Sequence, residues 1–135
     1  MLKKTIKYED FNGIERTEDC YFNLSKTELM EMELGTAGGF AEMLQRIVAA
    51  QDAPSLMAQF KTIILKSYGK KSDDGRRFIK SPEISAEFEQ TPMYDQIFTE
   101  LVTNDKEAAK FIEGIMPKEL VEQANANGNH PALMK

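Results

Sequence analysis

The residues that could support nucleophilic or acid–base chemistry are sparse in this chain, which has one histidine, His130, and one cysteine, Cys20. Nucleophilic catalysis needs a histidine held rigidly beside its partner, and His130 lies in a polar C-terminal stretch without hydrophobic periodicity. Cys20 falls on the apolar face of a predicted strand, where a buried thiol acts as an inert small hydrophobe. We therefore expect no catalytic residue and no enzymatic activity.

Metal and cofactor chemistry has no convincing set of residues either. The 22 Asp and Glu residues show no spacing that singles out an acid–base pair. The segment 73–75 (DDG) lacks the alternate ligands and distal Glu of a calcium loop, so we interpret it as a turn. A glycine-rich segment does not match a phosphate-binding or dinucleotide pattern, and we interpret it as a hinge between helices. Its glycines are Gly35, Gly38 and Gly39. The sequence thus predicts no metal site and no cofactor.

The charge balance argues against two classes of partner. The chain carries a net charge of −5. Non-specific nucleic-acid binding needs clustered Lys and Arg, and an acidic chain is poorly suited to anionic membranes, so we expect neither partner. One basic run, interrupted by Asp73 and Asp74, is interpreted as a solvated loop; it consists of Lys70, Lys71, Arg76, Arg77 and Lys80.

Length and cysteine content favour one intracellular domain. The chain has 135 residues, of which 41% are hydrophobic, enough to build a core. A single cysteine excludes an intramolecular disulfide. The N-terminal residues lack the apolar run of a signal peptide, and no stretch is long enough to span a membrane. We expect a soluble protein in a reducing cytoplasm.

The elements that would position any functional surface begin with a hairpin. Residues 3–11 and 14–24 are rich in Thr, Ile, Tyr and Phe, and Asn12-Gly13 separates them. The apolar residues of both strands sit at even positions, so paired residue numbers must sum to an even number if they share a face. We therefore predict a three-residue loop or a G1 bulge with Gly13 at positive φ. The face at odd positions should be exposed; it includes Lys7, Glu9, Glu15 and Asp19.

Helix signals follow the hairpin. Ser25 and Glu28 form a capping box for a helix that ends before Gly35. A second helical pattern runs from Phe40 to Val48. Asp52 should cap a third helix, with Pro54 in its first turn, which continues through Tyr68 and ends with Gly69 at its C′ position. The polar turn 70–77 and the short extended piece 77–79 together suggest a small second hairpin.

Proline and capping residues divide the C-terminal half into short helices at about 82–90, 92–103, 105–115 and 117–124. Their starts are marked by Ser81-Pro82, Thr91-Pro92, Asn104 or Asp105, and Met116-Pro117. The sequence therefore predicts an α+β fold in one domain, 1–124, with a hairpin at 3–24 and a mainly helical body at 25–124. Residues 125–135 are polar and aperiodic, and are predicted to be a flexible tail.

The order of segments resembles the tail assembly chaperones of long-tailed bacteriophages, across about residues 3–118. The segments that carry this resemblance are 5–13 (TIKYEDFNG), 21–29 (YFNLSKTEL), 64–69 (ILKSYG), 77–80 (RFIK) and 111–117 (FIEGIMP). The resemblance implies a chaperone that binds the tape measure protein, keeps it soluble and extended, and is displaced as tail tube subunits polymerise. It also implies a host-cytoplasmic protein that is absent from the mature virion, and a longer form made by frameshifting.

The implied chaperone function requires one surface for contact between subunits and another for contact with the client. A long client rod needs many copies related head-to-tail, so we expect a homo-oligomer. The hairpin edge and the hinge Gly35, Gly38 and Gly39 are the candidates for subunit contact. The candidates for client contact are Met43, Met57, Phe60 and Met93, although an ordinary core position is favoured for each one taken singly. The tail tube protein is a further possible partner.

Two other functions are weighed against this one. A structural tail-completion or connector subunit would remain in the finished particle, whereas a chaperone would not. A small DNA-binding regulator would use short capped helices, but the acidic charge and the lack of a basic recognition helix disfavour it.

Overall fold

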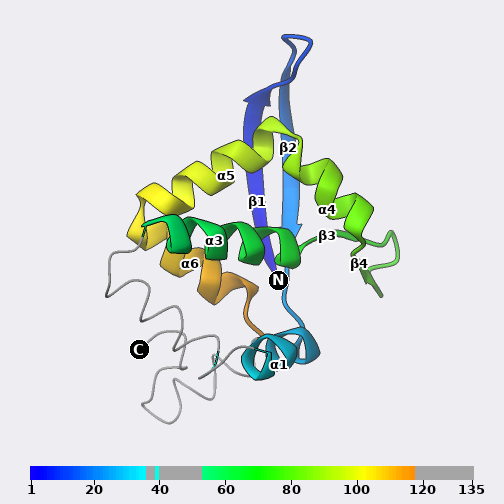
Figure 1. Cartoon of the computed structure of the whole chain (residues 1–135). Coiled ribbons are helices and arrows are strands. Elements are labelled where there is room, and N and C mark those ends of the chain that lie inside the picture. The colour runs from blue at the N-terminus through cyan, green and yellow to red at the C-terminus, as the bar shows by residue number, and fades with distance from the viewer. Residues whose placement is uncertain (36–38, 40–52, 118–135) are drawn as a thin grey trace.

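The computed structural model describes residues 1–35, 39 and 53–117. In these residues the expected α+β fold is confirmed. The elements in chain order are β1 (Leu2–Glu9), β2 (Glu15–Phe22), α1 (Lys26–Leu34), α3 (Ala53–Ser67), β3 (Tyr68–Lys71), β4 (Phe78–Ile79), α4 (Pro82–Glu89), α5 (Pro92–Thr103) and α6 (Asp105–Ile115) (Figure 1). The predicted helix 40–48, the cap at Asp52, the helix 117–124 and the tail 125–135 lie outside the described residues, apart from Pro117.

The first hairpin has the predicted register. Pairs run from Leu2↔Phe22 to Glu9↔Glu15, and the residue numbers of every pair sum to an even number. A three-residue loop, residues 11–13, closes the hairpin, and Gly13 has φ 78°. The Gly13 N–H donates to the carbonyl oxygen of Asp10 at 3.0 Å, as expected for a turn followed by a G1 bulge.

The two faces of the hairpin differ as the alternation predicts, except near the turn. The even-position residues Ile6, Cys20 and Phe22 are buried, and the odd-position side chains predicted to be wet are exposed. Ile14 also belongs to the even face, yet it is exposed. Ile14 directly precedes β2 at the turn end of the hairpin, and Figure 1 shows that this end extends past the helices.

The predicted second hairpin is confirmed and joins the first in one sheet of order β1-β2-β3-β4. The prediction for Gly69 was wrong: α3 ends at Ser67, and Gly69 pairs with Tyr21 in β3 instead of ending the helix. A Cβ on Gly69 would lie 2.7 Å from a Phe78 ring carbon and 2.9 Å from the Ile79 carbonyl oxygen. Glycine is therefore required by close packing between strands, not by a helix terminus.

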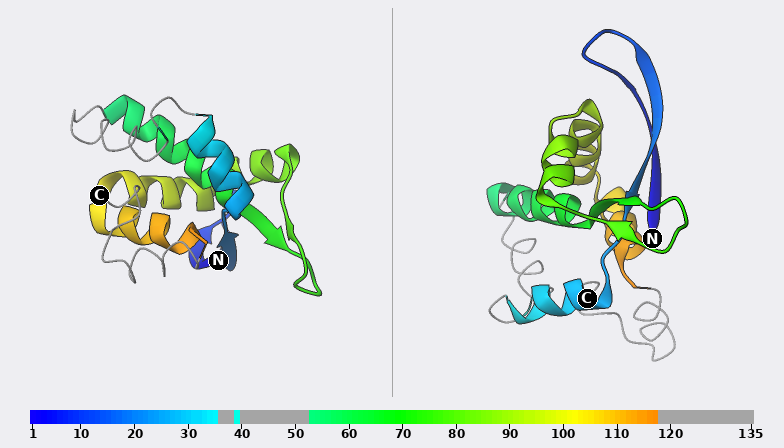
Figure 2. Two further views of the ribbon diagram at one scale, coloured as in Figure 1. Left: turned by 90° about the horizontal axis from the view of Figure 1, so that it is seen from below. Right: turned by 90° about the vertical axis from the view of Figure 1, so that its right-hand side faces the viewer.

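Helices α3 to α6 pack on one side of the sheet (Figure 2). Phe22 lies at the centre of the core and makes edge-to-face contacts with Tyr68, Phe88 and Phe111 at centroid distances of 5.7, 5.9 and 5.1 Å. Aromatic pairs in this geometry add to the stabilisation from burial. Among the apolar residues of α4, α5 and α6, Ile84, Phe98 and Ile112 are half-buried, whereas these are buried: Phe88, Tyr94, Ile97, Leu101, Phe111 and Ile115.

The predicted N-caps of the C-terminal helices are confirmed, because the side chains of Ser81, Thr91 and Asn104 accept hydrogen bonds from amides of the first turns. None of the described helices combines the length and apolar character needed to cross a membrane.

Candidate protein-binding site

The side chains best suited to react or to bind a metal are the single cysteine, the single histidine and the carboxylates. Within residues 1–35, 39 and 53–117, no three His, Cys, Asp or Glu side chains are grouped to hold a metal ion. Cys20 is 2% exposed, and burial raises the pKa of its thiol to about 11, so it is a core residue as predicted. His130 lies outside the described residues. The features that remain are surfaces.

Two exposed apolar surfaces lie on the first hairpin and on α1. The first, here the arm tip, is Phe11 and Ile14, which are 85% and 54% exposed. The second, here the α1 stripe, is Met30 and Leu34, which are 62% and 84% exposed. Figure 1 shows the hairpin turn and α1 at opposite ends of the molecule. A chain with such surfaces can contact two different partners at once.

The α1 stripe follows from the local sequence. Residues four apart lie on the same face of a helix, so Met30 and Leu34 are neighbours. Leu29 and Met32, on the other side, are buried. Methionine is flexible and polarizable, which suits a surface that must accept varied apolar partners.

A capping box fixes the start of α1, as predicted. The Glu28 amide donates to the Ser25 hydroxyl at 3.1 Å, and the Ser25 amide donates to the Glu28 carboxylate at 2.9 Å. Each side chain therefore satisfies a backbone amide that the helix leaves unpaired.

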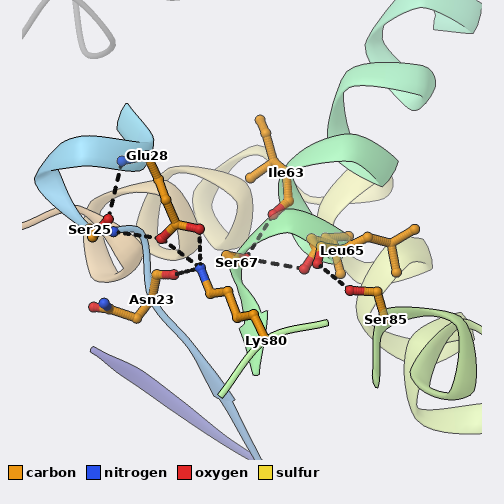
Figure 3. Close-up of polar contacts among 9 residues, drawn as sticks. Asn23, Ser25, Glu28, Ile63, Leu65, Ser67, Lys80 and Ser85 are labelled. Atoms are coloured by element: carbon orange, nitrogen blue, oxygen red, sulfur yellow. Dashed lines mark hydrogen bonds and ion pairs between the residues drawn. The ribbon is translucent and has the colours of Figure 1, made fainter. Parts of the chain in front are cut away.

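Lys80, which follows the second hairpin, forms an ion pair with Glu28 of this cap (Figure 3). Its ammonium lies 2.8 Å from both carboxylate oxygens of Glu28 and 2.7 Å from the Asn23 carbonyl oxygen. We call Asn23, Leu24, Ser25, Glu28 and Lys80 the α1 junction. Burial disfavours the charged Glu28 carboxylate, but the hydrogen bonds from Lys80 and Ser25 outweigh it and lower the Glu28 pKa.

The backbone of the α1 junction is joined to two helix ends. The Asn23 amide donates to the Ser67 carbonyl oxygen at 2.8 Å, and the Leu24 amide donates to the Ile115 carbonyl oxygen at 2.9 Å. These are among the carbonyls that a helix C-terminus leaves without an internal partner. The base of α1 is thus held by α3, α6 and the segment after β4, although α1 lies away from the main helical layer (Figure 1).

The interpretation of the basic run as a solvated loop is right for four residues and wrong for the fifth. Lys70, Lys71, Arg76 and Arg77 are exposed, whereas Lys80 is partly buried in the α1 junction. Its partner Glu28 is 52 residues earlier in the chain, and no local pattern signals a contact at that separation.

The arm tip is also held in a defined shape. The Asp10 carboxylate accepts hydrogen bonds from the amides of Asn12 and Ile14 at 2.8 and 3.0 Å. It also accepts one from the Arg16 guanidinium at 2.6 Å, and this bond is the main reason that the Asp10 pKa is lowered. Below the turn, the Tyr8 hydroxyl contacts the Glu18 carboxylate across the strands. The exposed Phe11 therefore lies on a turn whose backbone is fixed by hydrogen bonds.

Comparison with known protein families places the chain in one of them. A sequence profile described as phage tail assembly chaperone matches residues 1–133. The chain belongs to this family. No curated protein and no solved structure matches the chain. The resemblance drawn from the order of sequence segments is thus confirmed, and the match covers nearly the whole chain.

The structure places the predicted client residues of this tail assembly chaperone in different environments. Met57 is exposed on α3. Phe60 and Met93 are 6% and 9% exposed and belong to the core, where Met93 sulfur lies 3.5 Å from Cys20 sulfur. Met43 lies outside the described residues. Client contact stays a prediction for these residues, and burial of Phe60 and Met93 leaves little of either side chain for a partner to touch.

The glycines predicted to form a hinge or subunit contact are only partly described. Gly35 is the C-cap of α1 and has ordinary helical φ of −81°. Gly39 has φ 90°, a conformation that favours glycine. Gly38 lies outside the described residues, and the hinge and self-association roles of all three stay predictions. Sequence reasoning missed Phe11, Ile14, Met30 and Leu34 as exposed surface residues.

Proposed function

We propose that this tail assembly chaperone binds the phage tape measure protein, keeps it soluble and extended, and is displaced as tail tube subunits polymerise. The observation that supports this most is the α1 stripe. Met30 and Leu34 are exposed on a helix whose base is held by the α1 junction. A long helical client carries an apolar stripe that would aggregate if uncovered, and helices commonly recognise each other through such stripes.

The size of the α1 stripe suits a contact that must later be released. Full burial of one Leu or Met side chain contributes roughly 1.5–3 kcal/mol. Two side chains therefore supply only about 3–6 kcal/mol before the entropy cost of association is subtracted. One copy alone binds weakly, and many copies along one rod are needed to keep it covered. Polymerising tube subunits can then replace the copies one at a time.

The proposal extends to partners and place. We expect the chaperone to act in the host cytoplasm, to be absent from the mature virion, and to meet the tail tube protein as it is displaced. A longer, frameshifted form of the chain would share the same N-terminal domain. Mass spectrometry of purified particles tests the absence, and stoichiometric incorporation would instead indicate a structural subunit.

Co-expression with the tape measure protein tests client binding. The wild-type chain should raise the soluble fraction of the client and co-purify with it. The variant Met30→Ser/Leu34→Ser should do neither, although both side chains are too exposed for the change to unfold the domain. The matched control Thr27→Ser/Glu31→Gln, also on exposed positions of α1, should behave as wild type. Equal rescue by all three chains, or rescue by none, would contradict the proposal.

A further inference from the structure

The turn end of the first hairpin carries an unbalanced negative charge. We define the arm as residues 7–18; it holds four carboxylates and two cations, a net charge of −2. Arg16 forms an ion pair with Asp10, so its charge is already balanced within the arm. Glu9 and Glu15 are directly paired across the strands on the exposed face, and no ion pair within the described residues neutralises either one. Like charges directly opposite in a sheet are destabilising, so a cationic partner would relieve this pair.

The second hairpin has the opposite charge. Residues 70–77 hold four exposed cations and two carboxylates, a net charge of +2 in a chain whose total is −5. Asp74 is exposed, and its carboxylate accepts hydrogen bonds from the Ser72 hydroxyl and the Arg76 amide at 2.7 and 3.0 Å. Because the cations outnumber the carboxylates, they dominate the surface of this hairpin.

Aromatic side chains accompany these cations on the outer face of the sheet. The pairs Tyr21↔Gly69 and Lys71↔Phe78 put Tyr21, Lys71 and Phe78 on the face away from the helices. The Lys71 ammonium lies 5.2 Å from the centre of the Tyr21 ring. We call this surface, together with the turn that follows β3, the basic patch; it consists of Tyr21, Lys71, Arg76, Arg77 and Phe78.

The arm tip and the basic patch of one molecule cannot meet. β3 pairs with Tyr21 and Phe22 at the end of β2, whereas the arm tip precedes Glu15 at its beginning. The length of β2 separates them, and Figures 1 and 2 show the two hairpins pointing in different directions.

We propose that the arm tip of one copy of this chain docks on the basic patch of a second copy. Phe11 and Ile14 would lie against Tyr21 and Phe78, while Glu9 and Glu15 meet the cations around them. The two surfaces differ, so the contact is heterologous and repeats head-to-tail. It produces a ring if the rotation between neighbouring copies closes, and an open helical filament if it does not. This contact between two copies does not require the client. The self-association proposal can therefore be wrong while the proposed client binding is right, and client binding can be wrong while self-association is right.

Sedimentation velocity on the purified full chain tests this contact. The wild type should associate in a concentration-dependent way, and salt should weaken the association because exposed charges are screened. Phe11→Ser should raise the dissociation constant by about ten- to a hundredfold, the amount that burial of one large apolar side chain contributes. Wild-type chain that stays monomeric at all concentrations, or a Phe11→Ser chain that associates equally well, would overturn the proposal.

A charge swap makes the test specific to these two surfaces. Glu9→Lys/Glu15→Lys and Arg76→Glu/Arg77→Glu should each sediment as monomers, because like charges then face each other. Mixing the two variants restores opposite charges at every contact and should restore association. The control Lys106→Glu/Lys110→Glu changes the net charge as much as the second variant but lies on α6, and it should associate as wild type. If the mixture stays monomeric, or if the control also dissociates, the arm tip does not dock on the basic patch.

Discussion

The ammonium of Lys80 lies 2.8 Å from both carboxylate oxygens of Glu28 and joins the second hairpin to the start of α1. The two side chains are 21% and 27% exposed, so solvent screens this pair only in part. Together with the backbone hydrogen bonds from Asn23 and Leu24, this contact holds the start of α1, the helix that carries the α1 stripe.

Removal of the Lys80 ammonium should loosen α1. In Lys80→Met, the Glu28 carboxylate and the Asn23 carbonyl oxygen lose a charged donor. Loss of one partner from such a group costs on the order of 1–3 kcal/mol of unfolding free energy. Urea denaturation measures the cost, and hydrogen exchange of α1 amides should accelerate more than that of α5 amides. Unchanged exchange in α1 would show that Lys80 does not hold the helix.

The same contact should depend on pH. Because the Glu28 pKa is lowered in the folded state, its ionisation favours folding above the ordinary glutamate pKa of about 4.3. This contribution is lost as the pH falls through the lower, folded-state pKa. The difference in unfolding free energy between wild type and Glu28→Gln should therefore be largest near neutral pH and shrink below about pH 4. A difference that does not vary with pH would contradict this assignment.

Gly69 should be less tolerant of a methyl group than Gly75. Ala at 69 would force its Cβ against the Ile79 backbone, and overpacking of this kind costs about 1–3 kcal/mol. Ala at 75 meets no atom within 4 Å but must adopt φ 73°, which costs roughly 1 kcal/mol. Urea denaturation compares the two. In Gly69→Ala alone, the amides of β3 and β4 should also exchange faster, and equal exchange in both variants would contradict the packing argument.

Cys20 should react with thiol reagents only when the domain unfolds. Its sulfur is buried in the core, and a pKa of about 11 leaves only about one thiol in ten thousand ionised at pH 7. In the native protein, labelling by a disulfide reagent should be slow and should reach the rate of an unstructured peptide above the urea midpoint. Rapid labelling without denaturant would mean that β2 opens locally from the core.

Local patterns in the sequence predicted the parts of the fold that local physics decides. The alternation of apolar residues predicted the β1–β2 register. The capping-box pattern predicted the cap at Ser25, and a proline directly after Ser81 and Thr91 predicted the caps there. The pairing of β2 with β3 was not predictable in this way, because it joins Phe22 and Tyr68, which are far apart in the sequence.

The candidate site was harder to predict because exposure is decided by tertiary structure. Ile14 follows the buried pattern of the hairpin but is exposed, and it lies at the end of the hairpin that extends past the helices. Phe60 and Met93 are residue types that are common in binding surfaces, but in the folded chain both are buried in the core. Gly69 has the sequence context of a helix C′ residue, and only its pairing with Tyr21 in the folded sheet places it in a strand.

Titration of the purified chaperone with a helical fragment of the tape measure protein tests the central claim most directly. Calorimetry should show that Met30→Ser/Leu34→Ser weakens binding by tenfold or more, since two apolar side chains would remain in water. Phe11→Ser, on the other end of the molecule, should bind the fragment as wild type does. If the α1 variant binds with wild-type affinity, or if no chain binds the fragment, the α1 stripe is not the surface that holds the client.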